Sequence, residues 1–441
     1  MQKKNNHSSN VDVVVVGAGA AGLSATSELI RKGRSVLCIE AMDRIGGRCF
    51  TDHSIFGSAC DIGAHWLHNY SGNQIAQYGQ KNNERFNIYE IKEDILVYDG
   101  QKKVSPDNLL ETLSNIKSVK EKLLVSKVNL NDNKKSHRGD IPFINQIPNK
   151  LKENIWFETA HQALGACLAG VDFDEYTIFD EWLNYESIGE NDGFVEEGYG
   201  TLLVDFRKEV QVNLNTEVHE IKWNGKGVVL ETNQGTIKAK SCIVTVSTEI
   251  LRLGKIKFIP SLPIEKYEAF DGITLGAYNH ITLKLKKQFY DDFKIQPDTY
   301  FFSKIEKTNI PPKGYFGSLR LHKSNLSYFD VGGKFAKDLE EEGQEASIDF
   351  VLNSLRATFG SKFDQYLIKA HVTNWGKNKY TMGSYSSARP GKAHLRSVLK
   401  KPVGGRIFFA GEATSTNYGT VHGADLSGKE VANDLIGIIN N

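Results

Sequence analysis

The first forty residues predict an α/β protein whose first domain is a doubly wound, largely parallel sheet. Residues 12–16, DVVVV, are a run of β-branched residues typical of a buried strand, and a glycine-rich turn follows them. The stretch LSATSELIRKG has the character of a helix that ends at Gly33, and SVLCIE at residues 35–40 reads as a second strand. Strand, helix and strand in this order form a βαβ unit, which opens such a sheet.

Later segments alternate between the two periodicities. The segments expected to be helical are residues 107–125, 149–170, 347–360 and 422–439. The segments expected to be strands are a β-meander over 211–246 that ends in a parallel strand, one strand over 273–287 and a short buried strand over 405–411. A polar linker is expected at 129–140.

With 441 residues the chain is too long for one ordinary core, so two domains are expected. The segments that carry the parallel-sheet pattern lie at the start, the middle and the end of the chain. We therefore predict a discontinuous first domain formed by residues 11–75, 193–262 and 396–441. Residues 76–192 and 263–395 are expected to form the second domain.

Composition excludes several classes of protein. The net charge of +1 gives no bulk attraction to nucleic acid or to an anionic membrane. No stretch has eighteen consecutive apolar residues, so we expect no spanning helix, and Asp12 interrupts the apolar run that would otherwise imitate a secretory signal. The five cysteines show no CxxC spacing, which favours a reducing compartment without disulfides. A cytoplasmic location is expected.

The glycine-rich turn has the spacing Gly17-x-Gly19-x-x-Gly22 between strand and helix. The first glycine permits the tight turn, the second allows a pyrophosphate to approach the helix N-terminus, and the third allows close packing of helix on strand. Such a motif alone is often a structural turn. Here Glu40 ends the second strand, where its carboxylate can accept hydrogen bonds from ribose hydroxyls, so a dinucleotide site is favoured.

Two further motifs narrow the choice of cofactor to FAD. RIGGR, residues 44–48, begins four positions after Glu40 and offers the guanidinium of Arg48 to a phosphate. This run separates FAD enzymes from simple NAD dehydrogenases. In GRIFFAGEATSTNYGTVHGADLSG, Glu412 follows a strand and is expected at the ribityl chain. The helix that opens at VHGADLSG can turn its N-terminus toward the flavin and stabilise the negative charge of the reduced ring.

These motifs, with VEEGYGTLLVDF, SCIVTVSTEIL and NWGKNKYTMGSYSSARPG between them, resemble the flavin-containing amine oxidase superfamily over nearly the whole chain. Within it, DIGAHWLHN is most similar to the N-acetylpolyamine and spermine oxidases. The resemblance implies a fold like p-hydroxybenzoate hydroxylase, with a discontinuous Rossmann-like FAD-binding domain and an α+β substrate-binding domain. It also implies bound FAD, a small amine substrate and oxygen.

The resemblance and the motifs together give the expected site. The cofactor-binding residues are Gly17, Gly19, Ala20, Ala21, Gly22, Glu40, Arg48, Gly63, Ala64, His65, Val218, Trp375, Glu412, Thr420 and Val421. The residues expected to act on the amine or at the reacting edge of the flavin are His68, His280, Tyr385 and Thr420.

The individual assignments rest on matched positions. His68 matches the active-site histidine of animal polyamine oxidases, and Tyr385 matches one of two aromatic residues that sandwich the amine. Thr420 stands where monoamine oxidases have the second tyrosine. Ser384 stands where those enzymes bind the flavin through a cysteine, so non-covalent FAD is expected. His65 is left open between a structural histidine and a wall of the cavity.

Metal binding is not expected, because Cys60, His65 and His68 have no HExxH motif and no matching second pair.

Two positions depart from the superfamily. GAYNH places His280 where most members have a lysine that holds a water at flavin N5, and Lys284 is a poor substitute. Either a neutral His280 holds that water, or reactivity with oxygen is reduced. Asp425 replaces an apolar or aromatic residue, and it either recognises a second ammonium group or is a first-turn helix acid.

The sequence therefore predicts FAD-dependent oxidation of an amine, most simply a polyamine or acetylpolyamine, by hydride transfer to flavin N5, giving an imine and hydrogen peroxide. One alternative is another flavoenzyme, similar to amino-acid oxidases or to desaturases. The other is a flavin-binding protein with weak oxidase activity. No nucleic acid or membrane partner is expected, and the identity of the amine and the oligomeric state are left open.

Overall fold

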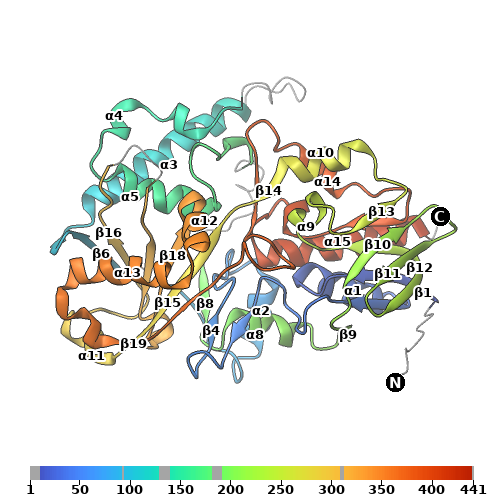
Figure 1. Cartoon of the computed structure of the whole chain (residues 1–441), viewed down its shortest axis with the longest axis horizontal. Coiled ribbons are helices and arrows are strands. Elements are labelled where there is room, and N and C mark those ends of the chain that lie inside the picture. Colours follow the sequence, from blue (N-terminus) through green and yellow to red (C-terminus); the bar gives the residue numbers. More distant parts are fainter. Residues whose placement is uncertain (1–9, 92–93, 129–139, 181–190, 308–311, 440–441) are drawn as a thin grey trace.

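The glycine-rich turn joins a strand and a helix at the centre of a large sheet. A computed structural model describes residues 10–91, 94–128, 140–180, 191–307 and 312–439 (Figure 1). The first sheet has eight strands in the order β13-β10-β11-β12-β1-β2-β9, with β21 paired to β12. Its strands are β1 (Asn10–Val16), β2 (Val36–Ile39), β9 (Val212–Asn213), β10 (Val218–Lys222), β11 (Val228–Thr232), β12 (Gly235–Val244), β13 (Lys257–Ile259) and β21 (Ile407–Phe409).

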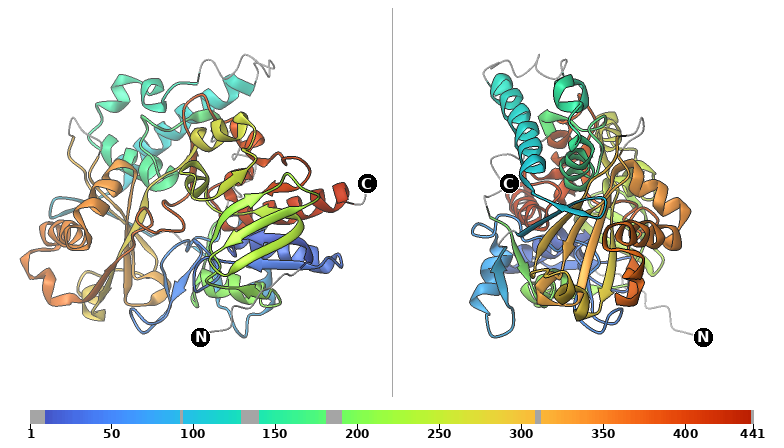
Figure 2. Two further views of the ribbon diagram at one scale, coloured as in Figure 1. Left: turned by 45° about the vertical axis from the view of Figure 1, so that its right-hand side comes forward. Right: turned by 90° about the vertical axis from the view of Figure 1, so that its left-hand side faces the viewer.

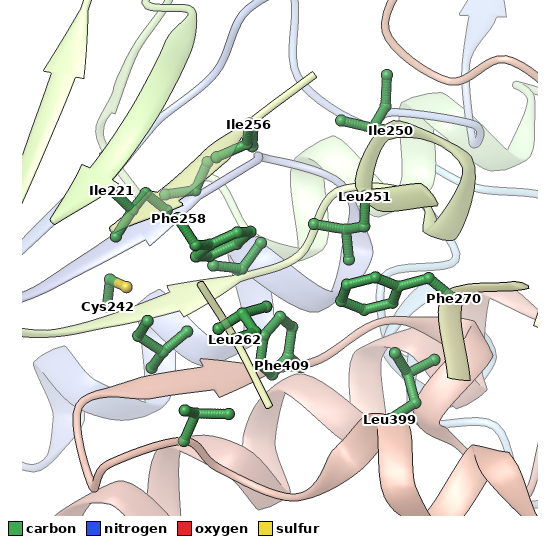
Figure 3. Packing of buried hydrophobic residues seen from close by; sticks show 14 of the residues in the cluster. Ile221, Cys242, Ile250, Leu251, Ile256, Phe258, Leu262, Phe270, Leu399 and Phe409 are labelled. Atoms are coloured by element: carbon green, nitrogen blue, oxygen red, sulfur yellow. The ribbon is translucent and has the colours of Figure 1, made fainter. Parts of the chain in front are cut away.

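Alternating side chains of β1 divide this sheet into two buried faces. Val13 and Val15 pack with α1 (Ala20–Arg31) and α15 (Val421–Ile439), which lie against each other. Val14 and Val16 belong to the core on the opposite side. Figure 3 shows part of that core, where Phe258 and Phe409 from the sheet meet Phe270 and Leu399 from the covering helices. Those helices are α9 (Thr248–Arg252), α10 (Ile264–Gly272) and α14 (Leu395–Lys400).

The second sheet has seven strands in the order β19-β15-β18-β17-β16-β6-β7. They are β6 (Asp94–Asp99), β7 (Lys102–Val104), β15 (Tyr278–Leu285), β16 (Thr299–Ser303), β17 (Phe316–Leu319), β18 (Leu326–Gly332) and β19 (Leu367–Val372). Neighbours are antiparallel except the pair β6 and β16, which is parallel. This sheet lies beside the first one in Figure 1.

Helices cover both faces of the second sheet. Figure 2 shows α3 (Asp107–Val128) on one side of its strands and α12 (Gly333–Glu342) and α13 (Gln344–Phe359) on the other. Ile281, Leu283 and Leu285 of β15 pack with α13 and α12. Because side chains alternate along a strand, His280 and Lys284, at even-numbered positions of β15, face the opposite side. They point away from α13, toward the loops of the first domain.

Short elements connect the two sheets. The two-stranded pairs are β3 (Thr51–Asp52) with β4 (Cys60–Asp61), β5 (Ile88–Glu90) with β8 (Gly193–Val195), and β14 (Ile273–Leu275) with β20 (Ser386–Ala388). Further α-helices in the described residues are α2 (Gln74–Lys81), α4 (Asn149–Lys152), α5 (Phe157–His161), α6 (Cys167–Ala169), α8 (Tyr199–Phe206) and α11 (Lys287–Asp292), and short 3-10 helices lie at Phe143–Gln146, Leu321–Lys323, Ser361–Tyr366 and Glu412–Thr414. No helix in the described part of the chain is long and apolar enough to cross a membrane.

Most of the expected elements are confirmed. β1, α1 and β2 form the βαβ unit, and β10, β11 and β12 form the antiparallel meander whose last strand runs parallel to β1. The helices expected at 107–125, 347–360 and 422–439 are α3, α13 and α15, and the strand expected at 405–411 contains β21. The linker expected at 129–140 lies outside the described residues except for its last one.

Two expectations were wrong in detail. The single strand expected over 273–287 is two strands, β14 and β15, separated at Gly276. A Cβ on Gly276 would lie 2.6 Å from the Gly170 carbonyl oxygen, so the chain passes this point against another backbone and changes pairing partner. The single helix expected over 149–170 is interrupted, with a π-helical turn at Gln162–Ala166 between α5 and α6.

Candidate active site

One cavity of about 1170 Å³ extends from the glycine-rich turn of β1 to the second sheet and α3. Its wall is built by the loops after β1 and β2, the segment 63–68, β15, and the start of α15. Every residue predicted from the sequence as a site residue lines this cavity except Gly22. Gly22 instead packs under the turn, where a Cβ would lie 1.9 Å from the Gly17 carbonyl oxygen.

The end of the cavity near β1 fits a dinucleotide. Glu40 is buried, and its two carboxylate oxygens accept hydrogen bonds from the Ala18 N–H at 2.7 Å and the Met42 N–H at 2.9 Å. Gly19, which caps α1, has no side chain to occupy the helix N-terminus, and a Cβ there would meet only Gly46 and Gly47 backbone atoms at about 4 Å. Gly19 therefore leaves room for a phosphate to approach the N-terminus of α1.

Arg48 and Glu412 connect this end to the middle of the cavity. Nη1 of Arg48 donates to Oε1 of Glu412 at 3.0 Å and also to the Ser384 carbonyl oxygen. Burial acts to raise the pKa of Glu412, but Arg48, Ser386 and Arg396 outweigh it, so the pKa lies below its usual value. Glu412 is consequently a fixed negative charge in the wall, and its oxygens also accept from the Gly419 N–H at 3.0 Å.

The segment 63–68 carries the backbone past the middle of the cavity. A Cβ on Gly63 would lie 1.8 Å from the Arg48 carbonyl oxygen and 3.1 Å from the ring of Trp375. The indole N–H of Trp375 donates to the Ile62 carbonyl oxygen at 3.0 Å, which fixes the ring against this segment. Gly63 is therefore required by close packing, and Trp375 forms a rigid aromatic wall.

Aromatic side chains form the next part of the wall. The ring of Tyr385 lies 5.6 Å from that of Tyr278, and its hydroxyl donates to the Cys167 carbonyl oxygen at 2.9 Å. His68 stacks nearly parallel to Trp66 at an interplanar angle of 6°. Asp192 holds the His68 ring in place, because its Oδ1 lies 2.9 Å from Nδ1 of His68.

His280 is held at both ring nitrogens. Nδ1 lies 2.5 Å from Oδ1 of Asp330, its register partner on β18, and Nε2 lies 2.8 Å from the Gly63 carbonyl oxygen. A carbonyl oxygen only accepts, so Nε2 carries a proton. Burial acts to lower the pKa of His280, but Asp330 and the Gly63 carbonyl outweigh it and raise the pKa. These contacts favour the protonated ring of His280 and leave no ring nitrogen for a water, which differs from the neutral, water-holding group expected from sequence.

His65 differs from its neighbour. It is 1% exposed, and neither ring nitrogen has a hydrogen-bond partner in the described residues. Its ring lies 4.9 Å from that of His280 and 5.3 Å from those of Trp66 and Tyr328. Burial and the nearby charge of His280 lower the pKa of His65 well below its usual value, so the ring is neutral. The interpretation of His65 as a hydrogen-bonded structural histidine does not fit this geometry.

Other predicted residues have roles that only the geometry reveals. The hydroxyl of Thr420 donates to the Asn417 carbonyl oxygen at 2.6 Å and accepts from the Gly423 N–H at 3.0 Å, so it caps α15 at the cavity wall. Lys284 donates to the Phe56 carbonyl oxygen at 2.7 Å and does not line the cavity.

Asp425 also has a structural contact. It accepts from Nη2 and Nε of Arg207, at 2.5 and 3.1 Å, and it does not line the cavity. Neither interpretation made from the sequence is correct: Asp425 is not placed to meet a substrate ammonium group, and it lies beyond the first turn of α15. It is instead one half of a buried ion pair.

Three residues of the site were missed by the sequence analysis: Tyr278 and Asp192 line the cavity, and Asp330 holds His280 from behind. Tyr278 precedes His280 by two positions, and the alternation of β15 was a signal that both face the cavity. Asp330 interrupts the apolar strand LSYFDVG, and a buried acid in such a strand is a signal for a partner. Asp192 had no comparable signal in the sequence.

Comparison with known proteins decides the family. The model of the family described as flavin containing amine oxidoreductase matches residues 20–436. The chain belongs to this family. It is thus an enzyme that oxidises amines with FAD as its cofactor, as the motifs predicted.

The most similar relatives and structures agree on the fold and the class. Probable polyamine oxidase 4 of Arabidopsis thaliana is 29% identical, over 97% of this chain and 87% of the relative. Polyamine oxidase 2 of the same plant is 30% identical, over 96% of this chain and 87% of the relative. Wild-type putrescine oxidase bound to putrescine matches the fold with a TM-score of 0.76 and 20% identity, over 97% of this chain and 99% of that one. The expected two-domain α/β fold is confirmed.

Proposed function

We propose that this enzyme oxidises a polyamine or an acetylpolyamine at a carbon next to nitrogen, and that oxygen is converted to hydrogen peroxide. The observation that carries the proposal is the pair His68 and Asp192 in the aromatic wall. A carboxylate beside stacked aromatic rings attracts an ammonium group, both through its charge and through cation–π contact. The names of the similar relatives, polyamine oxidases, support the same substrate class.

The protein's contribution is to bind and orient the amine. FAD supplies the chemistry, because its ring accepts the hydride from the carbon next to nitrogen. Tyr385 and Tyr278 pack against each other and offer the reacting end of the amine one fixed aromatic surface, and the hydrogen bond from Tyr385 to Cys167 prevents the Tyr385 ring from turning. The amine reacts in its neutral form, since the nitrogen lone pair drives the loss of hydride.

The far wall of the cavity suits a methylene chain. Leu110 and Leu113 of α3 face it together with Tyr300, Phe302 and Phe316 of the second sheet. Apolar surface of this kind excludes water and packs against the carbon segments between two nitrogens. A desaturase-like enzyme is disfavoured, because the described wall also contains His68 and Asp192 and is not wholly apolar.

A peroxide assay over a panel of amines tests the proposal. Spermine, spermidine, N1-acetylspermine and putrescine should be oxidised faster than benzylamine or L-amino acids. Asp192→Asn should raise KM for spermine about tenfold or more, because a charge-assisted hydrogen bond contributes about 1.5–3 kcal/mol, while KM for benzylamine changes less.

Asp174→Asn is the matched control, because Asp174 pairs with Lys334 at the surface and does not line the cavity. Equal effects of Asp192→Asn and Asp174→Asn on spermine, or fastest turnover of an amino acid, would contradict the assignment.

We further propose a cytoplasmic location. The support is that all five cysteines are free and that four of them are buried, an arrangement suited to a reducing compartment. Fractionation of cells that express the tagged protein tests this, and recovery from the medium or from a sealed organelle would contradict it.

A further inference from the structure

The end of one helical segment lies against Tyr385 in the wall of the cavity. α5, a π-helical turn and α6 follow one another from Phe157 to Ala169, and the segment ends at Gly170, which has a φ of 70°. The last carbonyl groups of a helix have no partner within it. One of them, the carbonyl of Cys167, accepts the hydrogen bond from the Tyr385 hydroxyl at 2.9 Å. The helix end Cys167–Gly170 therefore holds the polar tip of this ring.

Gly170 leaves room for the ring of Tyr385. A Cβ at this position would lie 3.1 Å from Cε2 of that ring and 3.4 Å from Cα of Gly276. A side chain there would press on the ring from one side while the Cys167 carbonyl holds its hydroxyl. The positive φ also disfavours any residue that has a side chain. Glycine at 170 is thus required both by the backbone and by Tyr385.

The helix end is itself anchored to the second sheet. The Gly170 carbonyl oxygen accepts from the N–H of Ala277, directly before β15, at 3.0 Å. Sγ of Cys167 donates to the carbonyl oxygen of Asp330 in β18 at 3.3 Å. The side chain of the same Asp330 holds His280. The helix end and His280 are therefore attached to the same two neighbouring strands, β15 and β18.

The π-helical turn explains how the thiol of Cys167 is oriented. Side chains five residues apart in a regular α-helix point about 140° away from each other around the axis, so they do not meet. Across the wider π turn Gln162–Ala166, Nε2 of Gln162 reaches Sγ of Cys167 at 3.4 Å, five positions later. The thiol is thus fixed from two sides, as an acceptor from Gln162 and as a donor to β18. Turns of this kind occur frequently at functional sites.

We propose that the helix end Cys167–Gly170 is a positioning element, which fixes the ring of Tyr385 so that the carbon next to nitrogen in the amine meets the flavin in one orientation. Cys167 and Gly170 are positioning residues that act through Tyr385. The proposal rests on the proposed role of Tyr385 in holding the amine, and not on which amine is used. A misplacement of about 1 Å can slow a reaction by about a hundredfold, so the rate of flavin reduction is the sensitive measurement.

Gly170→Ala tests the contact with the ring, and Gly33→Ala is its matched control. Gly33, just after α1, has a φ of 73°, but no described atom lies within 4 Å of the position that its Cβ would take, and it does not line the cavity. Both variants carry the same kind of backbone strain, so both should melt below wild type. Flavin reduction by saturating amine, followed by stopped flow, should be about tenfold slower in Gly170→Ala and unchanged in Gly33→Ala.

A second substitution shows whether the effect passes through Tyr385. Tyr385→Phe removes the hydroxyl and releases the ring from the helix end, so flavin reduction should again be about tenfold slower. If Gly170 acts through this ring, the double variant should be reduced within about threefold of the rate of Tyr385→Phe, whereas independent effects would multiply to about a hundredfold. Reoxidation by oxygen, which needs no amine, should be unchanged in each variant.

Substitution of Cys167 tests the anchor without backbone strain. Cys167→Ala removes the hydrogen bond to Asp330 and should slow flavin reduction about fivefold in the wild-type background, but not in the Tyr385→Phe background. Cys167→Ser keeps a donor and should be reduced within twofold of the wild-type rate. A merely structural Cys167 would give the same loss in both backgrounds.

The outcomes decide the proposal in either direction. Flavin reduction of Gly170→Ala within twofold of wild type, or multiplied effects in the double variant, overturns it. Reduction of Tyr385→Phe at the wild-type rate overturns it too, because the ring then does not orient the amine. If Gly170→Ala does not fold, equal rates in Cys167→Ala and wild type overturn it instead. Preference for an amine that is not a polyamine affects only the substrate assignment, because each variant is measured with the amine that wild type oxidises fastest.

Discussion

His422, in the first turn of α15, should make the enzyme sensitive to acid. It is 4% exposed and its Nε2 has no partner in the described residues. Burial, with a smaller contribution from His68, lowers the pKa of His422 from 6.5 to about 4. The N-terminus of a helix also disfavours a cation. In the folded enzyme this ring therefore stays neutral at a pH where the unfolded chain is protonated.

The sign and size of the effect follow from proton linkage. Between the unfolded and the folded pKa the unfolded chain binds one more proton, so stability is present above pH 6.5 and is lost as the pH falls toward 4. At about 1.36 kcal/mol per pH unit, lowering the pH from 6.5 to 5.0 destabilises the protein by about 2 kcal/mol through His422 alone. His322, whose pKa is also lowered to about 4 by burial, adds a similar amount.

The variant His422→Gln isolates this contribution, because glutamine does not titrate. Wild type should lose about 2 kcal/mol more than the variant between pH 6.5 and pH 5.0, which corresponds to roughly 4–8 °C in melting temperature for a folding unit of 150–250 residues. The comparison uses holoenzyme at both pH values, so effects of acid on flavin binding cancel. His219→Gln serves as the surface control.

Equal losses of melting temperature in wild type and His422→Gln would refute the reasoning. An NMR titration in which the ring of His422 protonates near pH 6.5 would do the same, since it would show that the buried ring is not kept neutral.

Three further predictions concern the cofactor and the fold. Arg48→Ala should lower the ratio of flavin to protein absorbance, because a cation in the wall of the cofactor site is lost. Arg48→Lys, which keeps the charge, should retain more flavin. Full flavin occupancy in Arg48→Ala would contradict this prediction. Because Ser384 replaces the cysteine that binds flavin in monoamine oxidases, acid precipitation should release the yellow colour into the supernatant, and colour kept in the pellet would show a covalent link. Asp425→Asn leaves Arg207 buried without its counter-charge and should cost about 3–5 kcal/mol of stability with KM unchanged; a KM effect without a lower melting temperature would show that Asp425 acts on substrate.

The cofactor end of the site was predictable because its determinants are local. Gly17, Gly19 and Gly22 lie within six positions. The turn itself requires Gly17, which has a φ of 103°, and Gly22, which packs on the Gly17 carbonyl oxygen, whereas Gly19 leaves the start of the helix open to a phosphate. Glu40 ends the next strand of the same βαβ unit. The spacing of such residues is set by one strand, one turn and one helix, so the sequence carries it almost completely.

The part of the site that faces the amine was less predictable, because its contacts join segments that are distant in the chain. His280 was found from its position in a motif, but its protonation depends on Asp330, fifty positions later in the chain and brought opposite it by the register of β15 and β18. The same holds for His68 and Asp192, which come from different loops. A side chain's charge state follows from burial and partners, and neither is written in its local sequence.

The sequence by itself determined the βαβ unit, the meander, the family and FAD as cofactor, because these depend on hydrophobic periodicity and on glycines and charges at short spacing. Only the tertiary structure decided that Asp425 pairs with Arg207 and that Thr420 caps α15. It also decided that Asp330 and the Gly63 carbonyl hold both ring nitrogens of His280 and raise its pKa, while burial lowers the pKa of His65, whose ring lies 4.9 Å away. The physical reason is that burial and hydrogen-bond partners arise when segments far apart in the chain pack together, and these partners fix which groups are charged and which remain available for chemistry.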